Sequence, residues 1–322
     1  MSILIYAESA DGKFKKVAFE LASYAKKVAE SMGTTVTAVT INQQDVSELS
    51  KYGVAKVLKV SDVALQNFNA KAYADVIKQA AQKESTQVVV LSSTTDSLYL
   101  APLLSIGLGA GFASNVVSLP LSTSPFQVKR TAFSNKAFAI TEVNTAIKVL
   151  SIAKNSYGIF ESANSLTEES FAPSLNAADF NVKVTSVEKT TGKVTIADAD
   201  IVVSGGRGLK GPENWGMLEE LATVLGAATA CSKPVSDLGW RPHSEHVGQT
   251  GKPVATNLYI AIGISGAIQH IAGINSSKVK VVINSDPEAP FFKVADYGVV
   301  GDAFDIVPRL TQKLKEFKAQ NS

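Results

Sequence analysis

Short apolar runs alternate with segments of helical periodicity along this chain. Residues 2–7, 35–41 and 87–91 are apolar or β-branched and predict strands. Between these runs, apolar residues recur at helical spacing over 14–28 and 73–80 and predict amphipathic helices. Strands that alternate with helices indicate an α/β fold, in which mainly parallel sheets are flanked by helices.

Two segments of the first half depart from this pattern. Residues 147–153 alternate between apolar and polar side chains, which favours an edge or half-buried strand. Residues 97–128 carry no charge, but polar residues and prolines interrupt the apolar run. We therefore expect a buried helix followed by a strand there, because a membrane span needs about 20 mostly apolar residues in succession.

The alternation fades near the middle of the chain and then restarts. Residues 162–180 are polar and predict a surface connection, 180–187 predict one more strand, and 189–193 predict a polar turn. The pattern that follows predicts strands at 201–203, 258–262, 279–283 and 297–300 and helices at 215–225, after 266, and at 304–317. We place the domain boundary near 193, which gives an N-terminal α/β domain over 1–192 and a second domain over 193–322.

Composition narrows the class of protein. The chain has 322 residues, 45% of them hydrophobic, so it can bury the cores of two domains. The 31 basic and 29 acidic residues nearly balance, which gives no electrostatic reason to expect nucleic-acid binding. A single cysteine excludes an internal disulfide. The strand-like run begins within two residues of Met1, with no basic segment before it, so we expect no targeting segment. We expect a cytoplasmic protein without membrane insertion.

Glycine-rich turns follow the predicted strands of the second domain. Ser204–Gly208 places an arginine on such a turn, and Ser265–His270 follows a strand and opens a helix, where free N–H groups attract anions. Gln249 and Thr250 lie in a Gly-Gln-Thr-Gly turn. The alternatives are a structural turn for the first segment, capping of the helix by Ser265, and an ordinary polar loop for the third.

Asn284 and Asp302 follow strands, where open α/β sheets bind ligands, although both residue types are also common in turns. His243 and His246 flank Glu245, but no second group of ligands accompanies them, so we do not expect a metal site. No nucleophile triad is recognisable, and Cys231 is expected to be a small buried residue.

Together these segments resemble the α subunit of electron transfer flavoproteins. The resemblance is specific over about 200–310, where order and spacing agree, and rests on pattern alone over 1–190. The matching segments are Val203–Lys210, Val247–Lys252, Ala261–His270, Asn284–Pro290 and Ala295–Gly298.

The resemblance implies a heterodimer in which the N-terminal domain contacts a β subunit. The C-terminal domain would then be a Rossmann-like FAD-binding domain holding one FAD, and the β subunit would hold AMP. Members of the family accept electrons from dehydrogenases, such as the acyl-CoA dehydrogenases of fatty acid β-oxidation. They pass these electrons to a membrane quinone oxidoreductase. The implied role is that of an electron carrier and not of an enzyme.

The resemblance also implies which residues bind the cofactor. Thr250 would contact the flavin N5 and His270 the flavin O2, where donors stabilise the negative charge of reduced flavin. The turn 265–269 would hold the ribityl and pyrophosphate groups, and Asn284 and Asp302 the adenosine end. The complete expected set is Arg207, Ser232, Lys233, Val247, Gly248, Gln249, Thr250, Ser265, Gly266, Ala267, Ile268, Gln269, His270, Asn284, Asp302 and Ala303.

One residue departs from the family pattern. Lys233 stands where the family usually has an arginine over the flavin, and lysine keeps the charge but lacks the planar fork of donors. Beside the electron carrier, three alternatives stay open, and the lysine bears on the second of them. The protein could be a flavin enzyme with His270 as base, an adenine-nucleotide-binding protein of the same fold without redox flavin, or a bifurcating electron transfer flavoprotein with a second FAD in the β subunit.

Overall fold

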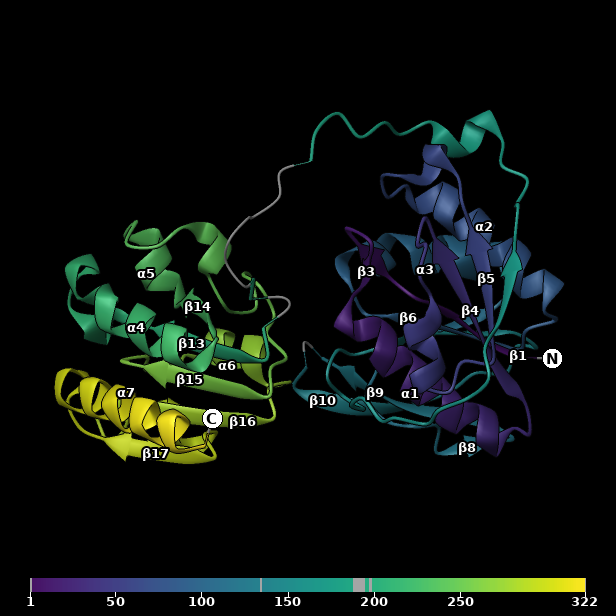
Figure 1. Cartoon of the computed structure of the whole chain (residues 1–322). Helices are drawn as coiled ribbons and strands as arrows, with labels where there is room; N and C mark the ends of the chain where they lie inside the picture. The colour runs from purple at the N-terminus through teal and green to yellow at the C-terminus, as the bar shows by residue number, and fades with distance from the viewer. Residues whose placement is uncertain (1, 134, 188–194, 197–198, 322) are drawn as a thin grey trace. The chain divides into compact units, whose positions relative to one another are not determined.

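The chain forms two compact units in the computed structural model, residues 1–187 and 188–322 (Figure 1). The structure describes residues 2–133, 135–187, 195–196 and 199–321. The predicted boundary near 193 and the predicted turn at 189–193 lie outside the described residues. Each unit is an α/β body with its own sheet, which confirms the predicted fold class.

The described strands of the first unit form a ten-stranded sheet in the order β10-β9-β7-β11-β6-β1-β4-β5-β12, and β8 pairs with β9 outside this path. Pairing is parallel from β7 to β12 and antiparallel from β7 to β10. The strands are β1 (Ser2–Tyr6), β4 (Thr35–Ile41), β5 (Lys56–Val60), β6 (Val88–Ser92), β7 (Gly111–Val116), β8 (Ser122–Thr123), β9 (Phe126–Ala132), β10 (Ala137–Glu142), β11 (Lys148–Ile152) and β12 (Thr167–Ser170).

Helices cover both faces of this sheet. Alternate residues of β1 contribute to different core clusters, Ile3 and Ile5 to the one beneath α1 and Leu4 to the one beneath α2 and α3. The helices are α1 (Lys16–Ser31), α2 (Ala70–Lys83) and α3 (Thr95–Leu108), with short 3-10 turns at Ser47–Lys51, Val63–Leu65 and Ala177–Phe180 and a small hairpin of β2 (Ser9–Ala10) and β3 (Lys13–Phe14).

Three predictions for this unit need correction. Residues 147–153 form a central strand, since β11 lies between β6 and β7 with Val149–Ile152 buried. The connection 162–180 is not irregular throughout, because it contains β12, which pairs with β5 (Figure 1). Backbone hydrogen bonds hold this strand, and polar residues can make them as well as apolar ones. Residues 181–187 form no strand, because their apolar side chains face solvent and no strand pairs with them among the described residues.

The uncharged segment 97–128 forms α3 and then β7, as predicted, but α3 is buried on one side only. Leu100 and Leu104 are buried, whereas Leu98 and Ile106 are exposed. Among the residues that the structure describes, no helix is both long enough and apolar enough to cross a membrane.

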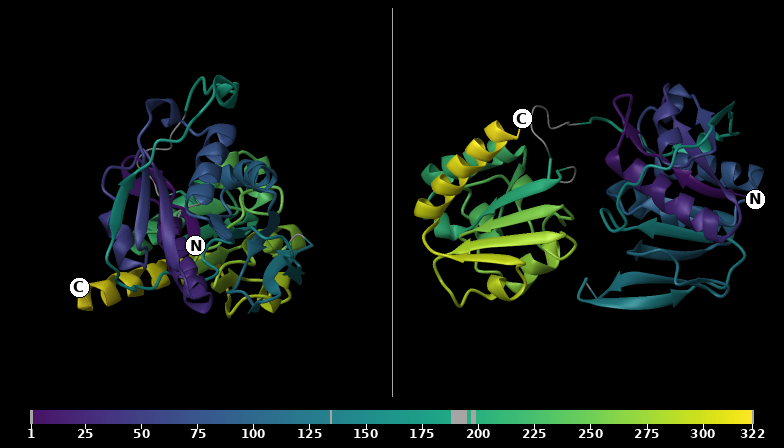
Figure 2. Two further views of the ribbon diagram at one scale, coloured as in Figure 1. Left: turned by 90° about the vertical axis from the view of Figure 1, so that its right-hand side faces the viewer. Right: turned by 60° about the horizontal axis from the view of Figure 1, so that its bottom comes forward.

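The second unit has a five-stranded parallel sheet over its described residues, in the order β14-β13-β15-β16-β17 (Figure 2). The chain passes from β13 outward to β14 and then crosses back to β15 on the other side of β13. Doubly wound sheets bind ligands at this kind of switch point, outside the carboxyl ends of the strands. The strands are β13 (Ile201–Gly205), β14 (Ala228–Cys231), β15 (Leu258–Ile262), β16 (Val279–Asn284) and β17 (Tyr297–Val300).

Apolar side chains fill both faces of this sheet. Val202 and Tyr259 face a cluster that includes Phe291, whereas Val203 faces a cluster with α4 and α7, whose helices pack on one another. The helices are α4 (Gly216–Leu225), α5 (Lys233–Asp237), α6 (Ile268–Ile274) and α7 (Ala303–Gln320), with 3-10 turns at Arg207–Leu209, Pro212–Trp215, His243–Glu245 and Pro290–Lys293.

The packing of α4 on the sheet can be tested in isolation, because both tryptophans of the chain, Trp215 and Trp240, belong to the second unit. Leu221 on α4 is completely buried, so Leu221→Ala is expected to destabilise this unit by about 2–5 kcal/mol. Phe317→Ala on α7 removes a 62% exposed side chain and is expected to cost under about 0.5 kcal/mol. Urea unfolding followed by tryptophan fluorescence measures the free energy of unfolding of both variants. Equal midpoints for the two variants would contradict the packing of Leu221 against the sheet.

Candidate functional site

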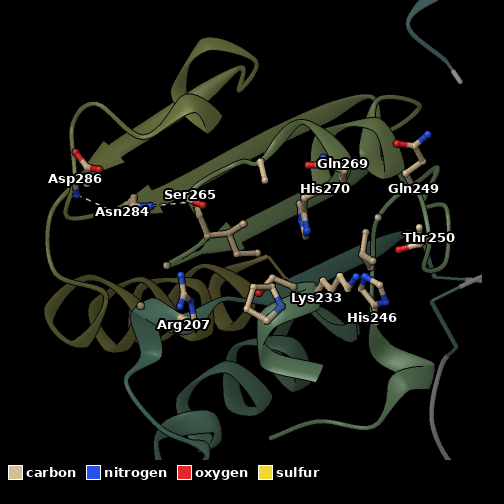
Figure 3. A pocket seen from close by; sticks show the side chains of 18 residues that line it. Arg207, Lys233, His246, Gln249, Thr250, Ser265, Gln269, His270, Asn284 and Asp286 are labelled. Carbon is tan, nitrogen blue, oxygen red and sulfur yellow. Dashed lines mark hydrogen bonds between the residues drawn. The ribbon is translucent and has the colours of Figure 1, made fainter. Parts of the chain in front are cut away.

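A cavity of about 520 Å³ lies at the carboxyl ends of β13, β14, β15 and β16, at the switch point of the second sheet (Figure 3). Each strand contributes the loop that follows it, so residues far apart in the sequence converge there. The lining residues are Arg207, Gly208, Ser232, Lys233, Pro234, His246, Val247, Gly248, Gln249, Thr250, Gly263, Ile264, Ser265, Ala267, Gln269, His270, Asn284 and Asp286.

Glycines let the loops after β13 and β15 approach each other backbone to backbone. A Cβ on Gly206 would lie 2.1 Å from the Gly263 carbonyl oxygen, and one on Gly208 would lie 2.6 Å from the Gly263 Cα. Gly263 itself has φ +62°, a conformation that side chains disfavour. The Gly208 N–H donates to the Gly263 carbonyl at 3.1 Å, so the two turns form one floor under the cavity.

The Gly248–Gly251 turn is held from two sides. The Val247 N–H donates to the Cys231 carbonyl at the end of β14, and the Gln249 N–H donates to the Gln269 carbonyl on α6 at 2.8 Å. A Cβ on Gly248 would meet the Gln269 carbonyl at 3.3 Å. These contacts place the Gln249 and Thr250 side chains at the cavity.

The turn between β15 and α6 bends sharply around Phe291. Gly266 has φ +87°, and a Cβ on it would lie 2.5 Å from the Phe291 backbone nitrogen. The helix begins at Ile268 after Ala267, without a side-chain cap, so Ser265 is not the N-cap that the sequence left open. The Ser265 carbonyl accepts from the Phe291 N–H, and the Ser265 hydroxyl makes no hydrogen bond with any described residue.

Polar side chains at the cavity are left without partners. Arg207 and Lys233 make no ion pair within the described part of the chain, and the only carboxylate at the cavity among the described residues is that of Asp286. Seven side chains at the cavity also make no hydrogen bond with any described residue, namely those of Arg207, Ser232, Lys233, Gln249, Thr250, Ser265 and Gln269. Side chains of this kind, with two cations among them, suit a polar anionic ligand.

His270 is one of the buried polar groups of the site. Its Nε2 lies 2.9 Å from the hydroxyl of Tyr259, and its Nδ1 is buried without a well-formed hydrogen bond in the described residues. Burial lowers the pKa of His270 to about 4, because the charged imidazole would lose its hydration, and His246 acts in the same direction. The Val247 carbonyl offsets part of this shift. His270 is therefore neutral at pH 7.

His246 also lines the cavity, although its sequence pattern predicted no role in binding a cofactor. It is 2% exposed, and burial lowers its pKa, with His243 as the next cause. No group of three metal-binding side chains gathers in the part of the chain that the structure describes. Burial raises the pKa of the nearby Cys231 thiol to about 12, so it is not a reactive thiolate.

Four residues of the expected cofactor set lie outside the lining of this cavity, namely Gly266, Ile268, Asp302 and Ala303. Asp302 instead caps α7 by accepting from the Phe304 N–H. Residues that line the cavity but were not expected are Gly208, Pro234, His246, Gly263, Ile264 and Asp286. Each is adjacent to an expected residue or follows a strand within a few positions, so a rule that included whole turns would have found them.

The lowered pKa of His270 makes the stability of the second unit depend on pH. Between its ordinary pKa near 6.5 and the folded value of about 4, the unfolded chain binds a proton at His270 that the folded chain does not. Stability therefore falls as the pH falls through this window, by up to about 3 kcal/mol from this group. We expect His270→Gln to remove this part of the loss.

Urea unfolding of the full chain at neutral and acidic pH, followed by tryptophan fluorescence, measures the effect. His243→Gln serves as the control, because it removes an exposed histidine by the same substitution. Equal losses of stability in wild type and His270→Gln would contradict the assignment.

Comparison with known proteins places this site in a family. Residues 3–187 match the model of the electron transfer flavoprotein domain, and residues 195–275 match that of the electron transfer flavoprotein FAD-binding domain. The chain is 35% identical to the electron transfer flavoprotein subunit alpha of Thermoanaerobacterium thermosaccharolyticum, with 98% of each chain covered. It is 34% identical to that of Bacillus subtilis, with 98% of this chain and 97% of the relative covered.

The corresponding subunit of Syntrophomonas wolfei is 36% identical, with 97% of this chain and 98% of the relative covered. The similarity thus extends over nearly the whole length of both proteins in each comparison. The chain belongs to the electron transfer flavoprotein alpha subunit family.

Proposed function

We propose that this chain carries electrons as the FAD-binding α subunit of a heterodimeric electron transfer flavoprotein, with one FAD in the cavity of the second unit. The observation that carries the proposal is the set of unpartnered polar side chains, with Arg207 and Lys233 among them, around a cavity at the switch point of a parallel sheet. Family membership and the matched FAD-binding domain support the same cofactor.

The residues at the cavity fit the chemical groups of FAD. Gly208 and Gly263 line the floor of the cavity without side chains, which favours close approach by a phosphate or a flat ring. The guanidinium of Arg207 and the ammonium of Lys233 complement a pyrophosphate or a reduced flavin. Neutral His270 has a buried nitrogen that lacks a well-formed hydrogen bond among the described residues.

Bound FAD would supply reversible one- and two-electron chemistry, and the protein would set its potential. We assign Thr250 to the flavin N5 and His270 to the flavin O2, as the resemblance implies. Donors at these atoms favour the reduced form, because they stabilise the negative charge that it gains. Ser265–Gln269 would hold the ribityl and pyrophosphate groups, and Asn284 with Asp302 and Ala303 the adenosine end.

We further propose that the first unit contacts a β subunit that holds AMP. Acyl-CoA dehydrogenases or other dehydrogenases would supply the electrons, and a membrane quinone oxidoreductase would accept them. The simple carrier with one FAD is favoured over a flavin enzyme, since a carrier needs no general acid or base at the ring.

The first test is the visible absorbance spectrum of the chain co-produced with its β subunit. We expect flavin bands from one FAD per heterodimer, and Arg207→Gln is expected to weaken FAD binding at least about tenfold, since a charge-assisted hydrogen bond contributes roughly 1.5–3 kcal/mol. Arg309→Gln on α7 removes an exposed arginine away from this cavity and is the matched control. A colourless heterodimer that refuses added FAD would overturn the proposal in favour of the adenine-nucleotide-binding alternative.

Lys233 tests how the site sets the potential. If its ammonium stabilises reduced flavin, Lys233→Met lowers the midpoint potential of the bound FAD, whereas Lys233→Arg keeps it near or above the wild-type value because the charge is retained. Redox titration of the three proteins measures this. Identical midpoints in wild type and Lys233→Met would show that the lysine points away from the ring.

The carrier role itself is tested by reduction of the heterodimer with a partner dehydrogenase and its substrate. Reduction that needs the dehydrogenase supports the carrier, whereas direct reduction by the small substrate alone would favour a flavin enzyme.

A further inference from the structure

A tyrosine behind His270 is not explained by cofactor contact. We infer that Tyr259 is a positioning residue, which donates its phenolic hydrogen to His270 Nε2 and thereby keeps the imidazole proton on Nδ1. The inference rests on the proposed FAD site, because it assigns to His270 the role of a donor toward the cofactor.

The contact is short and buried. The Tyr259 hydroxyl lies 2.9 Å from His270 Nε2, Tyr259 is completely buried, and His270 is 6% exposed. Burial raises the pKa of Tyr259, so its hydroxyl keeps its hydrogen, and His270 is neutral for the reason given above. Because both groups are neutral, either could donate in this hydrogen bond. If the Tyr259 hydroxyl donates, Nε2 carries no hydrogen, so the direction of donation decides the tautomer of His270.

The surroundings of the pair fix the direction of donation. Among the described residues, His270 Nε2 is the hydrogen-bond partner of the Tyr259 hydroxyl, and the buried hydroxyl of Ser204 makes no well-formed hydrogen bond. If Nε2 carried the hydrogen of the imidazole, the buried phenolic hydrogen would have no acceptor, which is costly. Nε2 is therefore the bare acceptor, and Tyr259 is the donor.

The ring of Tyr259 is itself held in place. It stacks on Phe291 with an interplanar angle of 2° and ring centroids 6.4 Å apart. The Phe291 N–H donates to the Ser265 carbonyl at 3.0 Å, which ties the same residue to the turn that leads into α6. Tyr259, Phe291 and His270 thus form one packed cluster at this wall of the cavity.

Tyr259→Phe removes the donor and keeps the stacked ring. In the FAD-loaded heterodimer we expect the affinity for reduced FAD, relative to oxidised FAD, to fall about tenfold, which lowers the two-electron midpoint potential by about 30 mV. The nitrogen NMR signals of His270, one of three histidines, are expected to change from a single Nδ1-protonated tautomer to a mixture. A merely structural role of Tyr259 would not change the tautomer.

Tyr24→Phe is the matched control, because Tyr24 is also completely buried and its hydroxyl donates to the Ser118 carbonyl at 3.2 Å in the first unit. It should change neither the midpoint nor the His270 signals. If Tyr259→Phe does not fold, the nitrogen NMR signals of His270 in the wild-type heterodimer decide, and an Nε2-protonated tautomer there overturns the inference.

The outcomes separate the inference from the proposed function. In a heterodimer that holds FAD, an unchanged tautomer or an unchanged midpoint in the folded variant overturns the inference and leaves the FAD site standing. A wild-type heterodimer that takes up no FAD contradicts the proposed function. The His270 signals of the FAD-free protein then decide alone, and a single Nδ1 tautomer in both wild type and Tyr259→Phe overturns the assignment of Tyr259.

Discussion

The backbone contact between the loops after β13 and β15 is the constraint on which the site depends. Gly206 and Gly208 lie so close to Gly263 that no side chain fits between the loops. β13 and β15 are neighbours at the switch point, where a doubly wound sheet opens a crevice. The contact between their loops therefore forms the floor of the cavity, and the flanking loops carry the side chains that surround it. The site is thus a consequence of sheet order combined with three small residues.

Polar groups at the cavity divide into two physical classes. Arg207 and Lys233 are exposed, so water satisfies them and leaving them without an ion partner costs little. His270 is buried, so an unsatisfied nitrogen there is costly, and the structure limits that cost by keeping the ring neutral and bonded to Tyr259. The exposed cations attract an anionic ligand, whereas the buried histidine distinguishes between ligands through a donor of fixed direction.

Much of this arrangement could be predicted from the sequence, and the exceptions have physical causes. Strands and helices with clear periodicity were predicted, and the turns after β13 and β15 were identified by their glycines. Strand β12 was missed because backbone pairing with β5 holds it, and residues 180–187 were wrongly predicted as a strand because alternation cannot show that no neighbour is available. The partnership of Tyr259 with His270 joins a strand to a helix through space, and no spacing in the sequence predicts such a contact.

The position of His246 shows how backbone and side-chain constraints combine. A Cβ on Gly251 would lie 2.9 Å from the His246 Nδ1, so the Gly-Gln-Thr-Gly turn can fold over this imidazole only because glycine stands there. The glycines therefore serve the packing of the turn as well as the approach of a ligand, and the same turn presents Gln249 and Thr250 to the cavity. Since a histidine and a turn that must bend around it fix each other's position, the backbone that carries these polar side chains is held before any ligand arrives, which reduces the entropy that binding must overcome.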